Sequence, residues 1–108
     1  MPGEVSYIVV FVTVCNSQEA EKIADVLLNE RKAACVNMVP SVKSKFWWEG
    51  KIDSTEESML IIKTKMSLFN EVVGRIKEVH SYKVPEIIAV PIIAGNDDYL
   101  HWISDEVK

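Results

Sequence analysis

Hydrophobic residues follow two different spacings along the chain, and together these predict strands and helices in alternation. Residues 5–14 are nearly all hydrophobic and β-branched, which predicts a strand covered on both faces. A second hydrophobic run at 87–93 predicts another, shorter strand that ends near Pro91. Within 17–31, 67–80 and 99–107, hydrophobic positions recur every three or four residues, so these three segments are predicted to be amphipathic helices.

Two long extended segments lie between the first and second predicted helices. They span 34–48 and 51–65, and the pair Glu49-Gly50 between them predicts a tight turn. Each arm of this hairpin approaches 15 residues, whereas strands usually have about five or six. We therefore expect the hairpin to project beyond one small domain, with a bend or an edge position at Pro40.

The predicted elements follow the order βαββαβ with one further helix at the end. This order predicts an α+β fold, a ferredoxin-like sandwich in which two helices cover one face of a four-stranded antiparallel sheet, and it makes 1–108 a single domain. The strands at 5–14, 51–65 and 87–93 are hydrophobic at odd and even positions alike, so the sheet has a second hydrophobic face. Because monomers rarely expose such a patch, we expect an obligate homo-oligomer that associates through its sheets.

Composition narrows the class of protein. The 108 residues include 26 valines and isoleucines but only five leucines, which favours a sheet as the main element. The net charge of −4 argues against nucleic acid as a partner, and no hydrophobic run reaches the length of a membrane-spanning helix. Cys15 and Cys35 form no C-x-x-C pair, so we expect two reduced thiols and a cytoplasmic location.

The chain lacks the sequence patterns of several chemistries that this fold can host. It contains no P-loop, G-x-S-x-G or H-E-x-x-H pattern, so no catalytic site is predicted and we expect no enzyme. The segment 57–63 lacks the aromatic residues of RNA-recognition domains. The first loop carries Cys15 alone, without the thiol pair of a heavy-metal chaperone.

Five segments resemble motifs of the CutA divalent-cation-tolerance proteins, in the same order along the chain. They are ERKAACVN at 30–37, WEGKI at 48–52, KT at 63–64, HSYKVPEI at 80–87 and GNDDYLHW at 95–102. The resemblance implies a ferredoxin-like subunit of a homotrimer that supports tolerance of copper and other divalent cations without being an enzyme. Animal members of this family are also linked to acetylcholinesterase processing or anchoring.

The resemblance also suggests where a metal ion would bind. In bacterial members a copper site is placed on a cysteine of the first strand and two adjacent histidines; the matching positions here are Val12, Val79 and His80, so only His80 agrees. We predict a metal site at His80 and Glu86, with Cu²⁺ or another divalent cation whose coordination other subunits complete. No cofactor is required. The alternative for His80 is capping of a helix end.

Other residues of these motifs are predicted to form a ligand cleft between subunits. Lys63, Tyr82 and Cys35 are assigned to this cleft, although Cys35 could instead serve packing and Lys63 an ion pair. Trp47 and Trp48 are predicted to contact a neighbouring subunit near the hairpin tip, because tryptophan often anchors interfaces.

Two further functions stay open from the sequence. The trimer could be a small-ligand sensor with binding sites between subunits, or a stable scaffold for protein partners. The acidic run at 53–57 is interpreted as a solvated face.

Overall fold

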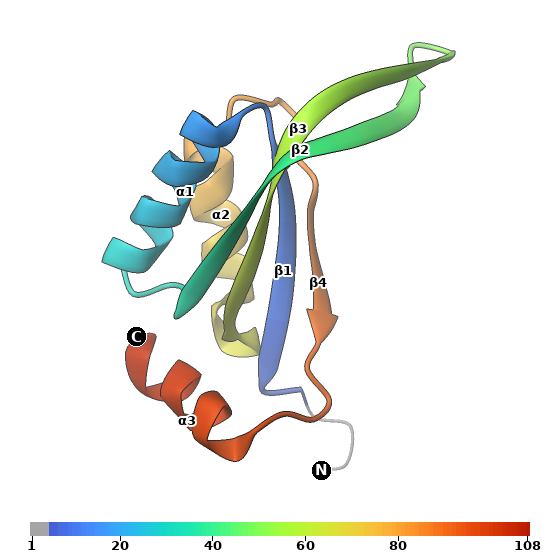
Figure 1. The fold of residues 1–108 in the computed structure, drawn as a ribbon. Coiled ribbons are helices and arrows are strands. Elements are labelled where there is room, and N and C mark those ends of the chain that lie inside the picture. Colours follow the sequence, from blue (N-terminus) through green and yellow to red (C-terminus); the bar gives the residue numbers. More distant parts are fainter. Residues whose placement is uncertain (1–4) are drawn as a thin grey trace.

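A four-stranded antiparallel sheet with two helices on one face forms the framework of the protein (Figure 1). The computed structural model describes residues 5–108, and its strand order is β2-β3-β1-β4. This order and the alternation of elements confirm the predicted α+β, ferredoxin-like arrangement. The elements are β1 Tyr7–Val14, α1 Ser17–Asn29, β2 Cys35–Trp48, β3 Lys51–Lys65, a 3₁₀ turn Met66–Leu68, α2 Phe69–Val79, β4 Ile87–Pro91 and α3 Asp97–Glu106.

The predicted bounds of the first two helices were wrong by a few residues. Helix α1 ends at Asn29 rather than at residue 31, because Arg31 adopts a left-handed backbone with φ of 59°. The second helix begins with a 3₁₀ turn over Met66–Leu68 and continues as α2 only to Val79, since His80 is already extended. The predicted end of the last strand near Pro91 is confirmed, because β4 ends at Pro91, which cannot donate a ladder hydrogen bond.

The hydrophobic core lies between the sheet and helices α1 and α2. Alternate residues of β1 point into it, and Val10, Val12 and Val14 are completely buried. Their partners on the helices, such as Leu27 and Ile76, are also completely buried. The core therefore follows from the period of two along the strand and of 3.6 along the helices.

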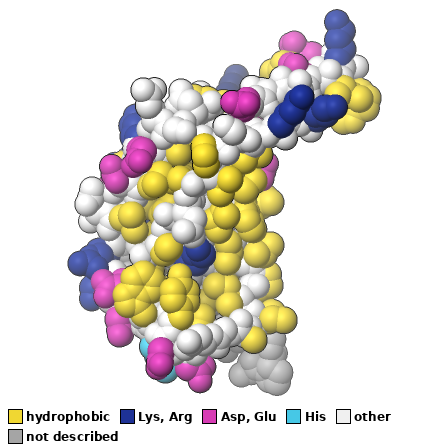
Figure 2. All heavy atoms as spheres, viewed as in Figure 1, with side chains coloured by type: hydrophobic (Ala, Val, Ile, Leu, Met, Phe, Trp, Pro, Cys, Tyr) yellow, Lys and Arg dark blue, Asp and Glu magenta, His cyan; other side chains and the backbone are white. Residues whose placement is uncertain are grey.

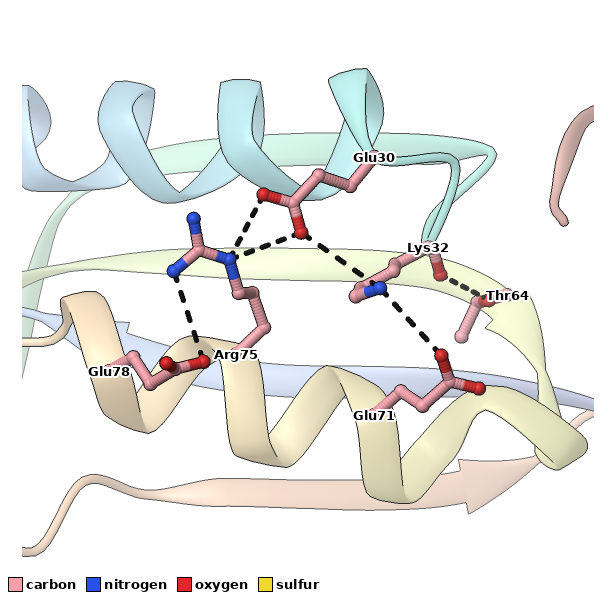
Figure 3. A network of polar contacts seen from close by, with 6 residues as sticks. All are labelled: Glu30, Lys32, Thr64, Glu71, Arg75 and Glu78. Carbon is pink, nitrogen blue, oxygen red and sulfur yellow. Dashed lines mark hydrogen bonds and ion pairs between the residues drawn. The ribbon is translucent and has the colours of Figure 1, made fainter.

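A polar network joins the end of α1 to α2 and to the sheet (Figure 3). The guanidinium of Arg75 lies 3.0 Å from a carboxylate oxygen of Glu30, and the ammonium of Lys32 lies 3.7 Å from Glu71. The buried hydroxyl of Thr64 donates a 2.7 Å hydrogen bond to the carbonyl of Lys32. These ion pairs remain partly exposed to water, which weakens them, so the buried bond of Thr64 does more to fix the turn after α1.

The hairpin of β2 and β3 extends well past the rest of the sheet (Figure 1). Its pairing shifts register between Val39 and Val42, which confirms the predicted irregularity at Pro40, and β2 is also an edge strand. At the tip, Glu49 and Gly50 both have positive φ, as a two-residue hairpin turn of type I′ requires.

The sheet face opposite the helices is hydrophobic, as predicted. The register of β1 and β4 places Phe11 beside Ile88 and Val9 beside Val90, and Ile88 and Val90 are 53% and 43% exposed. Hydrophobic side chains gather over the strands in the space-filling view (Figure 2). We call this surface the helix-free face. Helix α3 lies across one end of the sheet, where Arg31 pairs with Glu106.

Candidate functional site

A cavity of about 830 Å³ lies between one face of the hairpin and the segment 82–86, which connects α2 to β4. We call it the hairpin cavity. Its volume is within the range of about 300–1,000 Å³ that is typical of small-molecule sites. The side chains that line it are aromatic (Phe46, Trp48 and Tyr82), acidic (Asp53, Glu57 and Glu86), basic (Lys45 and Lys83), hydroxyl-bearing (Thr13, Ser44 and Thr55) and aliphatic (Val84).

The pairing of the two hairpin arms brings most of these side chains together. Ser44 is opposite Thr55, and Phe46 is opposite Asp53. Because alternate residues of a strand point to the same face, these two pairs share one face of the hairpin with Glu57. The segment 82–86 then supplies the other wall.

One hydrogen bond ties the two walls of the cavity to each other. The phenol of Tyr82 donates to Oε2 of Glu57 over 2.7 Å, and Glu57 is only 7% exposed. Burial raises the pKa of Tyr82 well above its ordinary value, and the hydrogen bond and negative charge of Glu57 raise it further. The phenol therefore remains a neutral donor at physiological pH.

The imidazole of His80 fixes the backbone next to Tyr82. Its Nε2 lies 2.8 Å from the carbonyl oxygen of Thr13, and its Nδ1 accepts a 3.0 Å hydrogen bond from the backbone N–H of Tyr82. A carbonyl only accepts and a backbone N–H only donates, so the ring is neutral with its proton on Nε2. The predicted position at a helix end is confirmed, since His80 is the C-cap residue of α2 and its backbone N–H donates to the carbonyl of Ile76. The ring itself has its partners outside α2.

The carboxylate of Glu19 holds the start of the same segment. It accepts hydrogen bonds from the backbone N–H of Ser81 at 2.7 Å, from the hydroxyl of Ser81 at 3.0 Å and from the backbone N–H of Cys15 at 3.0 Å. Burial raises the pKa of the Glu19 carboxyl, but the bonds from Cys15 and Ser81 outweigh burial and leave that pKa below its ordinary value. The N-terminal end of α1 thus anchors the segment that lines the cavity.

The predicted ligand-cleft residues fall into two separate places. Tyr82 lines the hairpin cavity, together with Glu86 from the predicted metal site. Lys63 and Cys35 pair with each other across β3 and β2, and the ammonium of Lys63 donates to the side chain of Asn37. They do not line the hairpin cavity, so within one chain the structure does not bring them together with Tyr82.

The two tryptophans of the predicted interface lie on opposite faces of the hairpin. Trp48 lines the hairpin cavity and is 61% exposed, whereas Trp47 points away and is 73% exposed. Their contact with a neighbouring subunit stays a prediction.

The predicted metal site has no complete ligand set within one chain. Among residues 5–108, no group of three or more histidine, cysteine, aspartate or glutamate side chains could hold a metal ion. Both ring nitrogens of His80 already have hydrogen-bond partners, so a metal ion at His80 would have to replace one of them. A site at His80 and Glu86 stays a prediction that requires ligands from other copies.

Several residues that line the cavity were not predicted, and Glu57 is the buried carboxylate among them. The run 53–57 was predicted to be a solvated face, and this is wrong for Glu57, which is buried. The alternation of side chains along the strand could have indicated burial, because Glu57 points to the same face of β3 as the hydrophobic residues Met59 and Ile61. The hydrogen bond to Tyr82, 25 residues away, had no sequence signal.

Comparison with known proteins places this chain in a protein family. Residues 8–106 match the model of a family described as CutA1 divalent ion tolerance protein. The chain belongs to the CutA1 family. A rice protein (Oryza sativa subsp. japonica) named Protein CutA 1, chloroplastic, is 45% identical over 101 residues, which are 94% of this chain and 57% of that protein. The divalent-cation tolerance protein CutA of Archaeoglobus fulgidus is 44% identical over 99 residues, 92% of this chain and 96% of that protein.

Solved CutA structures share the fold. The crystal structure of CutA1 from Oryza sativa matches with a TM-score of 0.94 at 44% identity, covering 96% of this chain and 95% of that one. The structure of the periplasmic divalent cation tolerance protein CutA from Archaeoglobus fulgidus matches with a TM-score of 0.92 at 43% identity, covering 94% of this chain and 99% of that one.

This chain is shorter than some of its relatives. The chain spans a little over half of the chloroplastic CutA relatives from rice and Arabidopsis, at 57% and 56% of their lengths. Across residues 5–108, none of the helices has the length and hydrophobicity needed to cross a membrane.

Proposed function

We propose that this chain is one subunit of a homotrimer that supports tolerance of divalent cations and catalyses no reaction. Membership of the CutA1 family supports the role in cation tolerance. The observation that carries the assembly is the helix-free face, on which Ile88, Val90 and Val39 are 53%, 43% and 39% exposed. Burying such a surface against other copies removes hydrophobic area from water and stabilises the oligomer.

Features of the hairpin support the same assembly. It projects from the subunit and carries Trp47, Trp48 and Ile52 with more than half of each side chain exposed. Large aromatic residues at such a position are typical of interface anchors. We propose that Trp47 and Trp48 contact the neighbouring subunit.

The proposal also includes direct binding of a metal ion. Glu86 is exposed in the hairpin cavity, and a carboxylate suits a divalent cation. We propose that Glu86 and His80 bind Cu²⁺ or another divalent cation, that other copies complete the coordination, and that no cofactor is required. His80 would exchange its bond to Thr13 or to Tyr82 for the metal.

Two experiments test this proposal. Expression of the chain in a copper-sensitive strain that lacks its own homologue should raise the copper concentration at which growth stops, and no change would contradict the tolerance role. Calorimetry with Cu²⁺ should give saturable heat that Glu86→Gln weakens. Absence of saturable heat would show that the chain does not bind copper directly.

A second candidate function is recognition of a small organic ligand in the hairpin cavity. The volume of the cavity, its aromatic lining and the buried carboxylate of Glu57 favour this function. Stabilisation by a metal-free ligand in a thermal-shift screen would support it.

We propose a cytoplasmic location, because Cys15 and Cys35 are free thiols. The named relatives include chloroplastic and periplasmic proteins, so cell fractionation with a tagged chain is the test.

A further inference from the structure

We propose that the hairpin cavity binds an organic ammonium cation. The inference names the ligand class for the second candidate function, and it rests on that function. Three aromatic side chains, Phe46, Trp48 and Tyr82, line the cavity. The faces of aromatic rings attract cations, and attract them more strongly where the cation leaves water.

A carboxylate at the wall of the cavity adds the charge that an ammonium group needs. Glu57 is 7% exposed, and its Oε2 accepts the hydrogen bond from Tyr82. Among residues 5–108, every fully buried side-chain oxygen has a hydrogen-bond partner, whereas Oε1 of Glu57 has none. Oε1 is therefore not fully buried. It is open to the cavity and free to accept from a ligand N–H or to face a quaternary nitrogen.

The remaining charges favour a cation over an anion. Asp53 and Glu86 place two more carboxylates in the lining, whereas the basic side chains are Lys45 and Lys83. Asp53, Glu86 and both lysines are all exposed, so water solvates these four charges, whereas the carboxylate of Glu57 is buried and decides the sign of the preferred ligand. An anion would be repelled by that buried carboxylate, and the repulsion is stronger where water is excluded.

Within one chain, the hairpin cavity suits an organic cation better than a bare metal ion, which at Glu86 would need ligands from other copies. A metal ion needs several oxygen or nitrogen ligands within bonding distance of one point, and within the described chain no three such side chains meet. A cavity of about 830 Å³ with its acidic groups spread along the walls instead fits a molecule with an ammonium group at one end.

The test is calorimetric titration of the full chain, in the presence of a chelator, with choline and with 3,3-dimethyl-1-butanol, its neutral isostere. Choline should bind at least about tenfold more tightly, a ratio that corresponds to about 1.4 kcal/mol. Glu57→Gln keeps an acceptor for Tyr82 but removes the charge, and it should weaken choline binding by about tenfold. Glu56→Gln is the matched control, because Glu56 is exposed on the opposite face of β3, and it should leave binding within about twofold.

Each other result overturns the inference in a distinguishable way. Equal binding of both isosteres would show a hydrophobic site with no preference for ammonium. Binding of succinate or phosphate without choline would reverse the charge of the ligand while leaving the small-ligand function intact. If choline, spermidine, succinate, phosphate and the alcohol all fail to bind, both the inference and the small-ligand function are wrong, whereas the proposed cation tolerance is unaffected.

Discussion

The phenol of Tyr82 and the carboxylate of Glu57 are joined by a 2.7 Å hydrogen bond that links the α2–β4 connection to the projecting hairpin. Behind Tyr82, His80 connects the same backbone to the carbonyl of Thr13 on β1. Three parts of the fold that are far apart in sequence thus position one wall of the hairpin cavity. A change at any of these residues should alter both stability and the shape of the cavity.

Tyr82→Phe should destabilise the protein. Among residues 5–108 it removes the only hydrogen bond to the side chain of Glu57 and leaves a buried carboxylate without a partner, which costs about 1–3 kcal/mol. Urea denaturation followed by tryptophan fluorescence measures the difference. The double variant with Glu57→Gln should lose less than the sum of the two single changes, and strictly additive losses would show that the two residues do not act together.

His80→Ala should lower stability even when no metal is present. The substitution leaves the carbonyl of Thr13 and the N–H of Tyr82 without their side-chain partner, with an expected cost of about 1–3 kcal/mol. Denaturation in the presence of a chelator is the measurement, and His101→Ala on the exposed side of α3 is the control. A variant as stable as the parent in chelator, but impaired in copper binding, would assign His80 to the metal alone.

Glu19 should make the anchoring of Ser81 depend on pH. Its pKa in the folded protein lies below the ordinary carboxyl value, so it stabilises the fold above the unfolded-state pKa of about 4.3, and this stabilisation is lost as pH falls through the lower folded value. The stability difference between the parent and Glu19→Gln should therefore be largest at neutral pH and shrink in acid.

Paired thermal melts from pH 7 to pH 3 measure this difference. Glu21→Gln, also on α1 but exposed, should show no such trend. A difference between the parent and Glu19→Gln that stays constant with pH would contradict the role given to the ionised carboxylate.

Val90→Glu should break the assembly without unfolding the subunit. It places a charge on the helix-free face, where Val90 is 43% exposed in the single chain and is proposed to be buried between copies. Sedimentation velocity should show a smaller particle with an unchanged circular dichroism spectrum. Leu28→Glu, at a residue 37% exposed on α1, is the matched control and should keep the parent size.

Sequence patterning predicts the fold well because local periodicity and burial agree in this chain. The arm at 51–65 was predicted with its observed bounds, since the Glu49-Gly50 turn marks its start. The second hydrophobic face was also predictable, because both parities of β1 and β3 are hydrophobic.

The candidate site was predicted only in part. Tyr82 and Glu86 belong to one local motif and line the same cavity. Lys63 and Cys35 belong to other motifs and lie elsewhere on the sheet, because strand register, which residue types do not reveal, decides their position. Glu57 was missed since a carboxylate within an acidic run indicates solvent unless its buried partner is known.

The molar mass in solution tests the central claim, that this chain is a subunit of a homotrimer, most directly. Light scattering coupled to size-exclusion chromatography should give about three times the 12.2 kDa of one chain. This mass should persist on dilution to low micromolar concentration and in the presence of a chelator. A mass of 12.2 kDa under these conditions would contradict the account of the helix-free face and of the hairpin tryptophans.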